Sequence, residues 1–257
     1  MRVLIACEYS GTVRDAFIRA GHNAISCDLL PTELPGPHYQ GDVFDIINDG
    51  FDMMIAHPPC TYLSVSGMHW TARGLRDPKL TEDALNFVKA LITAPINKIA
   101  LENPVSVISS RIRKPDQIIQ PWWFGDNASK KTCLWLKSLP KLELNINKVV
   151  CPDGWSKVMC AADMVECDCC GEPFCPECDS HYADCECIEP TEDDVTTKEV
   201  DNVLFGTRIK PAPKMIWANQ TPSGQNKLGP SPDRWKERSR TYPGIAEAMA
   251  EQWSNAL

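Results

Sequence analysis

The sequence His57-Pro58-Pro59-Cys60 places a thiol directly after an apolar run that is typical of a buried strand. Each proline fixes its own φ angle and restricts the residue before it, so the cysteine is held in a rigid, extended loop. Most free cysteines are small buried apolar residues, and we interpret Cys7, Cys27 and Cys133 in this way. For Cys60, the rigid loop at a strand end favours a nucleophile.

An acid follows a second apolar run, in Ile99-Ala100-Leu101-Glu102. Burial at this place is expected to raise the pKa of Glu102, so that its carboxyl group keeps a proton. When a thiolate attacks carbon 6 of a pyrimidine, charge moves into the ring, and a protonated carboxyl at nitrogen 3 stabilises it. Because an Asn-Pro sequence such as Asn103-Pro104 is also common in turns, a structural role for Glu102 as a cap or turn residue stays open.

The elements that must position these two side chains alternate between apolar runs and helical periodicity. Strands alternating with helices predict an α/β fold, with a doubly wound, mostly parallel sheet and right-handed crossovers. In such a sheet, ligands bind at the carboxyl ends of the strands, where Cys60 and Glu102 lie. Strands are expected at Arg2–Cys7, Ala24–Asp28, Asp52–His57, Lys98–Glu102 and Thr132–Leu136, and helices at Val13–Ala20, Thr81–Thr93 and Pro243–Trp253.

Composition divides the chain into a core of residues 1–150, an insertion of residues 151–202 and a last region of residues 203–257. The last region begins with a Pro-, Gly- and Lys/Arg-rich stretch, Thr207–Arg240, which shows little periodicity and is expected to be an ordered loop. The final amphipathic helix is expected to return to the core. Without a signal peptide or an apolar run long enough to span a bilayer, we expect a cytoplasmic protein with no membrane partner.

Charge is distributed very unevenly along the chain, whose formal net charge is −8. Residues 1–150 carry 16 Lys and Arg against 15 Asp and Glu, and residues 203–257 carry 8 against 4. Residues 151–202 carry 2 against 15. Outside the insertion, the balance is therefore slightly basic and compatible with contact to nucleic-acid phosphate.

Nine of the 13 cysteines lie in the acidic insertion. Without a signal for secretion, a metal site is a better explanation for this cluster than a disulfide framework. The spacing offers enough ligands for two tetrahedral zinc sites, of which we expect at least one to form. Its role would be structural, because protein ligands would close all four positions around the metal. The acidic surface should repel DNA, which favours a protein partner for this module. The candidate zinc ligands are Cys167, Cys170, Cys175, Cys178, His181, Cys185 and Cys187, with Cys169 competing for the place of Cys170.

With these motifs in this order, the chain resembles the DNA cytosine-5 methyltransferase family, especially its short phage-type members. Cys60 matches the nucleophile of the family's Pro-Cys loop, and Glu102-Asn103-Pro104 matches its Glu-Asn-Val motif, with proline in place of valine. The resemblance implies a Rossmann-like enzyme that uses S-adenosylmethionine. It also implies that Cys60 bonds to carbon 6 of a cytosine flipped out of DNA, and that carbon 5 is then methylated.

The resemblance also assigns residues to the cofactor. The loop Glu8-Tyr9-Ser10-Gly11 takes the place of the family's glycine-rich loop but keeps only Gly11 of its glycines. Asp28 would accept a hydrogen bond from the ribose and Asp42 would contact the adenine. Pro58 and Gly244 complete the expected cofactor pocket, Gly244 within the Tyr242-Pro243-Gly244-Ile245 segment that returns to close it.

Two lysines, Lys130 and Lys131, stand where the family has its Gln-x-Arg-x-Arg motif, whose basic residues help to bind the target base; we assign Lys131 to the catalytic set. Lysine lacks the planar fork of arginine, so the contact is expected to differ in detail. The region that recognises DNA must lie between Lys137 and Arg240. Its candidate phosphate contacts are Arg208, Lys210, Lys214, Lys227, Arg234, Lys236, Arg238 and Arg240.

Three other functions stay open. An amino-group methyltransferase has a similar Pro-Pro loop, but with an acid or amide before it and an aromatic residue after it. An enzyme that modifies free pyrimidine nucleotides could also carry a Pro-Pro-Cys nucleophile. A catalytically silent binding module of the same fold is compatible with the reduced glycine loop. A zinc deaminase is excluded because the His-x-Glu partner of its Cys pair is missing.

Overall fold

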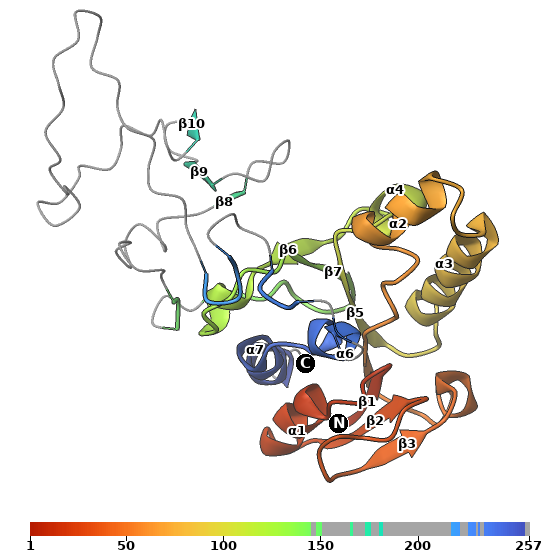
Figure 1. Ribbon diagram of the computed structural model, residues 1–257. Coiled ribbons are helices and arrows are strands. Elements are labelled where there is room, and N and C mark those ends of the chain that lie inside the picture. The colour runs from red at the N-terminus through yellow and green to blue at the C-terminus, as the bar shows by residue number, and fades with distance from the viewer. Residues whose placement is uncertain are drawn as a thin grey trace, which may run out of the picture.

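The computed structural model describes residues 1–144, 148–150, 165–166, 173–175, 180–181, 217–221, 226–229, 231 and 234–254 (Figure 1). Among these residues, no helix combines the length and apolar character that crossing a membrane requires.

A seven-stranded sheet in the order β3-β2-β1-β4-β5-β7-β6 forms the centre of the protein. β7 runs antiparallel to both of its neighbours, β5 and β6, and the strands from β3 to β5 pair in parallel. The expected mostly parallel sheet is therefore confirmed. The strands are β1 Arg2–Ala6, β2 Asn23–Asp28, β3 His38–Gln40, β4 Met53–Ala56, β5 Lys98–Pro104, β6 Gln117–Ile119 and β7 Thr132–Lys137.

The strand order reverses between β1 and β4, which pair side by side although β2 and β3 lie between them in the sequence. In open α/β sheets, ligands bind at the carboxyl ends of the strands at this switch point. The loop after β1 and the loop after β4 both leave the sheet here. These are the loops that carry Glu8 and Cys60.

Helices cover both faces of the sheet. One face packs against α1 and α7, which lie side by side, and the other packs against α3 and α4. The helices are α1 Thr12–Arg19, α2 Val65–Ala72, α3 Pro78–Ile92, α4 Ile108–Arg111, α6 Arg234–Ser239 and α7 Pro243–Ser254, with short 3₁₀ helices η1 Val43–Asp45 and η2 Pro121–Phe124.

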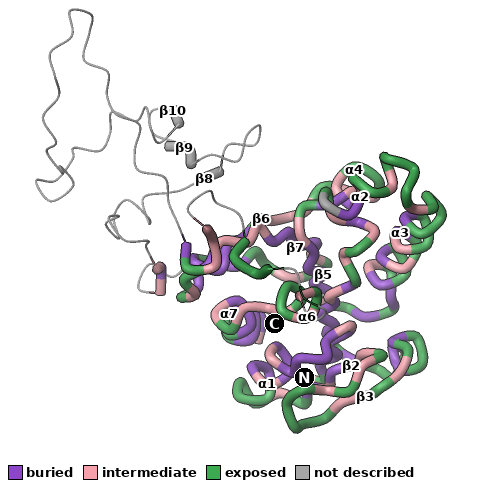
Figure 2. The backbone as a smooth tube through the Cα atoms, in the orientation of Figure 1, coloured by how far each residue is buried: buried purple, intermediate pink, exposed green. Residues whose placement is uncertain are grey.

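The central strands β1 and β5 consist mainly of buried residues, as the purple colour in Figure 2 shows. Side chains alternate along a strand, so Val3 and Ile5 face α1 and α7 while Leu4 and Ala6 face α3. Continuous apolar runs such as Val3–Ala6 are what a strand covered on both faces requires.

All eight elements expected from the sequence form, and their bounds differ by at most a few residues. Cys27 and Cys133 are buried, as expected, whereas Cys7 is only partly buried. The sequence patterns did not predict β3 and β6, which have three residues each, or α2, whose start depends on a hydrogen bond from Gly67 N to Ser64 Oγ (3.2 Å). A helix, α6, forms where a loop was expected, because none of the residues of this helix is buried and no apolar periodicity marks it.

The described residues on either side of residues 151–216 are fixed to the same place, η2. Val150 N donates a hydrogen bond to Trp122 O (3.0 Å), and the ring of Trp217 stacks on that of Trp122 with centroids 5.2 Å apart. Asn219 then binds both the amide and the carbonyl of Ser129 (3.1 and 2.9 Å). The chain therefore leaves the core and returns to it at one point.

Between these two ends, three short strands form a second, antiparallel sheet in the order β10-β9-β8. They are β8 Val165–Glu166, β9 Pro173–Cys175 and β10 Ser180–His181, so the backbones of Cys175 and His181 lie in neighbouring strands. The other candidate zinc ligands, Cys167, Cys170, Cys178, Cys185 and Cys187, lie outside the described residues, as does Cys169.

Candidate active site

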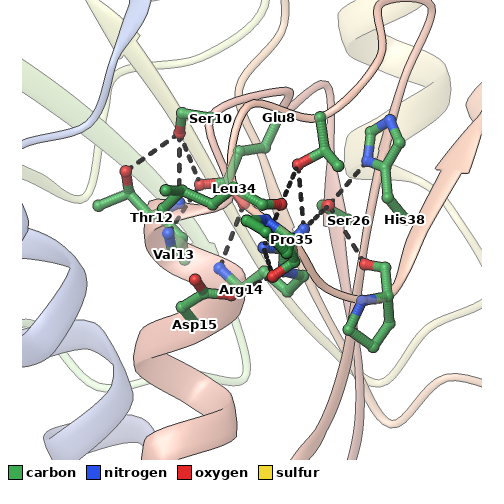
Figure 3. Close-up of polar contacts among 12 residues, drawn as sticks. Glu8, Ser10, Thr12, Val13, Arg14, Asp15, Ser26, Leu34, Pro35 and His38 are labelled. Atoms are coloured by element: carbon green, nitrogen blue, oxygen red, sulfur yellow. Dashed lines mark hydrogen bonds and ion pairs between the residues drawn. The ribbon is translucent and has the colours of Figure 1, made fainter.

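The loop after β1 is organised by the carboxylate of Glu8 (Figure 3). Val13 N and Arg14 N donate hydrogen bonds to its two oxygens (2.7 and 3.2 Å), and Ser10 Oγ donates a third (3.1 Å). The amide groups at a helix N-terminus attract anions, and here a side chain of the protein itself takes that position. The start of α1 therefore has no free amides for the phosphate of a dinucleotide.

Arg14 is fully buried and holds the segment that follows β2 (Figure 3). Its guanidinium pairs with Asp15 Oδ1 (2.8 Å) and donates to Thr32 Oγ1 (3.1 Å) and to Leu34 O (3.0 Å). A side chain added at Gly11, whose φ is 78°, would collide with this guanidinium. This explains why Gly11 is the glycine that the loop keeps.

Two carboxylates lie at the ends of β2 and β3. Asp28 is partly buried and accepts a hydrogen bond from Leu30 N (2.9 Å), and burial raises the pKa of its carboxyl group. Gly41 N donates to Asp28 O (3.0 Å), which brings the end of β3 close to it. Asp42 is exposed and accepts from Phe44 N (3.0 Å). Both predicted cofactor acids therefore lie at one edge of the sheet.

An exposed apolar side chain follows each of these acids. Leu29 is 73% exposed and Phe44 is 41% exposed. The ring of Phe44 is braced edge-on by Phe87 of α3, with centroids 5.5 Å apart. The edge thus combines hydrogen-bond acceptors with apolar surface, which suits a nucleoside.

The helix α6 lies against the loop after β1. Tyr9 Oη donates to Lys236 O (2.8 Å), and its ring lies 6.2 Å from that of Trp235. Arg240 Nη2 donates to both carboxylate oxygens of Glu33 (2.8 Å to each). The predicted cofactor loop is therefore covered by residues that come more than 220 positions later in the sequence.

The loop after β4 and the end of β5 form the second half of the site. Ala56 pairs with Leu101, so the next residues along each strand, His57 and Glu102, are neighbours. His57 Nδ1 lies 2.9 Å from Glu102 Oε2, and the two side chains are only 6% and 7% exposed. Asn103 Nδ2 donates to Pro58 O (2.8 Å), which ties the Pro-Pro loop to β5.

The expected protonation of Glu102 is wrong. Burial alone would raise the pKa of this carboxyl group, but the charge of Lys130 and the hydrogen bond from His57 outweigh burial and lower the pKa. Neither neighbour follows from the apolar run that precedes Glu102, because Lys130 comes from the loop before β7. In the described site, Glu102 is therefore an ionised acceptor.

Cys60 is partly exposed at the beginning of a tight turn, in which Leu63 N and Ser64 N donate to Cys60 O (3.1 and 2.9 Å). Burial raises the pKa of its thiol; Glu102 adds to this effect, while the positive charges of Lys130 and Arg238 oppose it. The start of α2 packs closely against this turn, so that a side chain at Gly67 would collide with Thr61 O. The thiol is thus held in place and is mainly protonated.

Of the two adjacent lysines, Lys130 is the one whose charge acts on both Cys60 and Glu102. Its Nζ donates to Arg238 O (3.2 Å) and lies 6.0 Å from the centre of the Tyr242 ring. Lys131 is partly buried and lies directly before β7. The role that we predicted for Lys131 stays a prediction, and Lys130 is the better placed residue.

Gly244 lies at the start of α7, where its amide donates to Asp126 Oδ2 (2.9 Å). A side chain there would collide with Phe124 O, so this glycine permits close packing of α7 on η2. Its predicted contact with a cofactor stays a prediction.

No individual role in this site was predicted for His57 or Asn103, and Arg238 was predicted only as a phosphate contact. The strand register could have identified His57, since it follows β4 in the same way that Glu102 follows the paired part of β5. Arg238 gave no such signal. Among the described residues, no group of three or more His, Cys, Asp or Glu side chains could hold a metal ion.

No protein-family model and no curated protein matches the chain. One of the solved structures that match it is a crystal structure of a prophage-encoded protein of E. coli, described provisionally as a DNA modification methyltransferase. The sequence identity is 15% and the TM-score is 0.36, and the match covers 53% of this chain and 46% of the other. A likeness of this extent, over less than half of the neighbour, carries no argument about function.

Proposed function

We propose that the protein is an S-adenosylmethionine-dependent methyltransferase that bonds Cys60 Sγ to carbon 6 of cytosine in DNA and methylates carbon 5. The observation that carries this proposal is the placement of Cys60 after β4 and Glu102 at the end of the neighbouring strand β5, with the two segments joined by the hydrogen bond from Asn103 to Pro58. The charge of Lys130, from the loop before β7, acts on both groups. This set lies beside the switch point of the sheet, where a cofactor is expected.

The residues after β1, β2 and β3 fit S-adenosylmethionine. Glu8 fills the phosphate position at the start of α1, so a cofactor without phosphate suits this loop better than a dinucleotide. Asp28 would accept from the ribose hydroxyls, and Asp42 from the adenine amino group, with Leu29 and Phe44 as apolar contacts for the ring. When bound, the cofactor supplies an electrophilic methyl group.

The residues after β4 and β5 would bind and activate the base. Cys60 Sγ adds to carbon 6, which makes carbon 5 nucleophilic. Glu102 hydrogen-bonds to the edge of the base that carries nitrogen 3, and Lys130 stabilises negative charge on the thiolate and the ring. After methyl transfer, loss of the proton on carbon 5 and departure of the thiolate restore the aromatic ring.

A DNA substrate is supported by the basic residues of α6 and of the segment directly after it. Arg234, Lys236, Arg238 and Arg240 belong to α6 or follow it directly, and α6 lies next to both halves of the site. Such residues would hold phosphates on either side of a flipped nucleotide. Of the other predicted phosphate contacts, Lys227 is exposed, and Arg208, Lys210 and Lys214 lie outside the described residues.

The zinc site of the insertion remains part of the proposal, on the evidence of its cysteine spacing alone. A structural site should bind at least one zinc ion per chain, and mass spectrometry of the native protein measures this number directly. A metal-free protein purified without chelators would remove zinc from the proposal and leave the role of Cys60 untouched.

The test of the proposed function compares the wild type with Cys60→Ser on cytosine-containing DNA, with radiolabelled S-adenosylmethionine and digestion of the product to nucleosides. We expect labelled 5-methylcytosine from the wild type and none from the variant. Unimpaired 5-methylcytosine formation by Cys60→Ser would contradict the covalent mechanism. No labelled nucleoside from the wild type on any DNA would contradict the proposed function.

A second candidate, an amino-group methyltransferase, is favoured by one observation. The lowered pKa of Glu102 makes it an ionised acceptor, and such a group can hold an exocyclic amine. The same digestion separates the two candidates, because label would then appear in a base methylated on nitrogen, in the wild type and in Cys60→Ser alike.

A further inference from the structure

Two exposed tryptophans lie on helices that contact the loop of Cys60. Trp70 in α2 is 46% exposed and Trp235 in α6 is 53% exposed. The other tryptophans among the described residues are buried or partly buried. Because an indole ring has a large apolar surface, leaving it in water is unfavourable, and exposed tryptophans are typical of binding surfaces.

The helix α2 is fixed to the turn that begins at Cys60. At the start of the helix, the hydroxyl of Ser64 accepts a backbone hydrogen bond (3.2 Å). Beyond its end, Arg76 Nη1 donates to Thr61 O (3.0 Å), and Thr61 directly follows Cys60. Both ends of α2 are therefore attached to this turn, and Trp70 lies on the helix between them.

The helix α6 contacts the other side of the same loop in sequence, the residues before Cys60. Thr241 Oγ1, just beyond the end of α6, lies 3.4 Å from His57 Nδ1. At its start, the ring of Trp235 lies 6.2 Å from that of Tyr9, in the loop after β1. Trp235 is thus held next to both halves of the site.

A positively charged side chain accompanies each indole ring. The ring of His69 lies edge-on to that of Trp70, with centroids 6.0 Å apart, and Arg73 Nη1 lies 3.3 Å from His69 Nε2. Lys236 Nζ lies 5.7 Å from the centre of the Trp235 ring. A ring that is already held in place loses little conformational entropy when a flat ligand stacks on it.

The charge of these two segments is complementary to phosphate. Residues 60–76 contain two arginines and one histidine but no Asp or Glu. Residues 234–240 contain four basic residues and one acid, Glu237, which is paired with Arg240 (3.0 Å). Exposed aromatic rings among positive charges are the features that bind an unpaired nucleic-acid strand, since the rings stack on bases and the charges bind phosphates.

We propose that Trp70 and Trp235 stack on unpaired bases next to the target nucleotide, and that the protein binds an unpaired DNA strand in preference to a duplex. The inference rests on the proposed DNA substrate. In a duplex, every base is stacked between its neighbours, and flipping out one base leaves a single gap that one ring can fill. Two exposed indoles on separate helices therefore match a strand whose bases are free to stack.

The first test measures binding of a fluorescein-labelled single-stranded oligonucleotide, about 12 nucleotides long and containing one cytosine, by fluorescence anisotropy without cofactor. In Trp70→Ala and in Trp235→Ala we expect the Kd to rise about tenfold. Trp70→Tyr and Trp235→Tyr, which keep an aromatic ring, should stay within about twofold of the wild type. Unchanged binding by both alanine variants, or an equal loss in the tyrosine variants, would overturn the proposal.

Leu75→Ala is the matched control, because Leu75 is an exposed apolar residue of the same segment (63%) that cannot stack on a base. We expect its Kd to equal that of the wild type. A loss as large as that of Trp70→Ala would mean that apolar area alone is responsible and would overturn the stacking role. Urea denaturation of every variant checks that the fold is intact.

The second test removes the bases instead of the rings. The same oligonucleotide is made with abasic sites at every position except the cytosine. If the indoles stack on the neighbouring bases, Trp70→Ala and Trp235→Ala should bind this strand as well as the wild type does, because the partners of the rings are already missing. A tenfold loss on the abasic strand as well would contradict stacking.

The third test separates charge from stacking and single strand from duplex. Arg73→Ala should lower the slope of log K against log salt by about 0.7, as the loss of one phosphate contact requires, while Trp70→Ala leaves the slope unchanged. The wild type should bind the single strand more tightly than a duplex of the same sequence. Tighter binding of the duplex would overturn the preference for an unpaired strand.

Failure of the proposed function is distinguishable from failure of this inference. If the wild type forms no 5-methylcytosine, the proposed reaction is overturned. The binding comparisons involve no methyl transfer, so they still decide whether Trp70 and Trp235 stack on an unpaired strand.

Discussion

The two halves of the site use their charged groups in opposite ways. In the half formed by β1, β2 and β3, Glu8 and Arg14 are occupied by contacts with the protein's own backbone amides and carbonyls. In the half formed by β4, β5 and β7, the charges of Cys60, Glu102 and Lys130 act on one another. The first half, which we call the cradle, is a rigid surface formed by the residues after β1, β2 and β3. In the second half, the ionisable groups interact mainly with one another.

The largest expected effect is on kcat and comes from Glu102. It tests whether the second half of the site acts on the reaction without affecting cofactor binding. Glu102→Gln removes the carboxyl group that is proposed to bind the nitrogen 3 edge of the base, so we expect kcat to fall about 100- to 10,000-fold while cofactor affinity is unchanged. Steady-state kinetics and calorimetric titration with the cofactor measure the two quantities. An equal loss in both would break the comparison, because Glu102 would then belong to the cradle as well.

The next effect concerns stability and belongs to the first half. Arg14→Leu leaves Asp15 and the carbonyl of Leu34 without their partner inside the protein, so we expect the free energy of unfolding to fall by about 3 kcal/mol. Urea denaturation measures this change. The matched control is Arg111→Ala, whose pair with Glu82 is half exposed and should contribute less than about 1 kcal/mol. Equal effects of the two substitutions would contradict the special place of Arg14.

A smaller effect tests the cofactor acid alone. If Asp28 binds the ribose hydroxyls as proposed, Asp28→Asn weakens those hydrogen bonds, so we expect cofactor affinity to fall about tenfold with kcat at saturation nearly unchanged. Calorimetric titration and saturation kinetics measure both. A large loss of kcat at saturating cofactor would show that Asp28 acts on the chemistry and would weaken the division into halves.

The smallest effect concerns the reactivity of Cys60. The charge of Lys130 opposes the effect of burial on the thiol, so Lys130→Met should raise the pKa of Cys60 further. Less thiolate is then present at any pH below that pKa, and alkylation of Cys60 by iodoacetamide should slow at neutral pH. Peptide mass spectrometry follows the modification of this cysteine, and Lys131→Met serves as the control. Equal slowing in both variants would remove the distinction between the two lysines.

The sequence predicts the parts of the molecule that depend on local patterns. Val3–Ala6 is apolar without interruption because both faces of β1 are covered, and this made the sheet predictable. Cys60, Glu102 and Asp28 could be assigned to one edge because the carboxyl ends of parallel strands meet there.

The parts that could not be predicted depend on contacts between distant segments. The direction of the Glu102 pKa depends on Lys130, 28 positions later, and on the geometry of His57, so its apolar surroundings gave the wrong sign. The helix α6 buries none of its residues, so its sequence has no apolar periodicity from which a helix could be predicted. Yet it covers Tyr9 and brings Arg238 near Cys60.

The shared anchor at η2 bears on how this protein could change over time. Val150 and Trp217 both contact Trp122, so the contacts of the core do not depend on the length of chain between these two residues. Each doubling of a flexible loop adds only about 0.6 kcal/mol to the cost of closing it. Recombination could therefore exchange residues 151–216 for another segment without disturbing the sheet, and the proposed chemistry at Cys60 could be inherited separately from that segment.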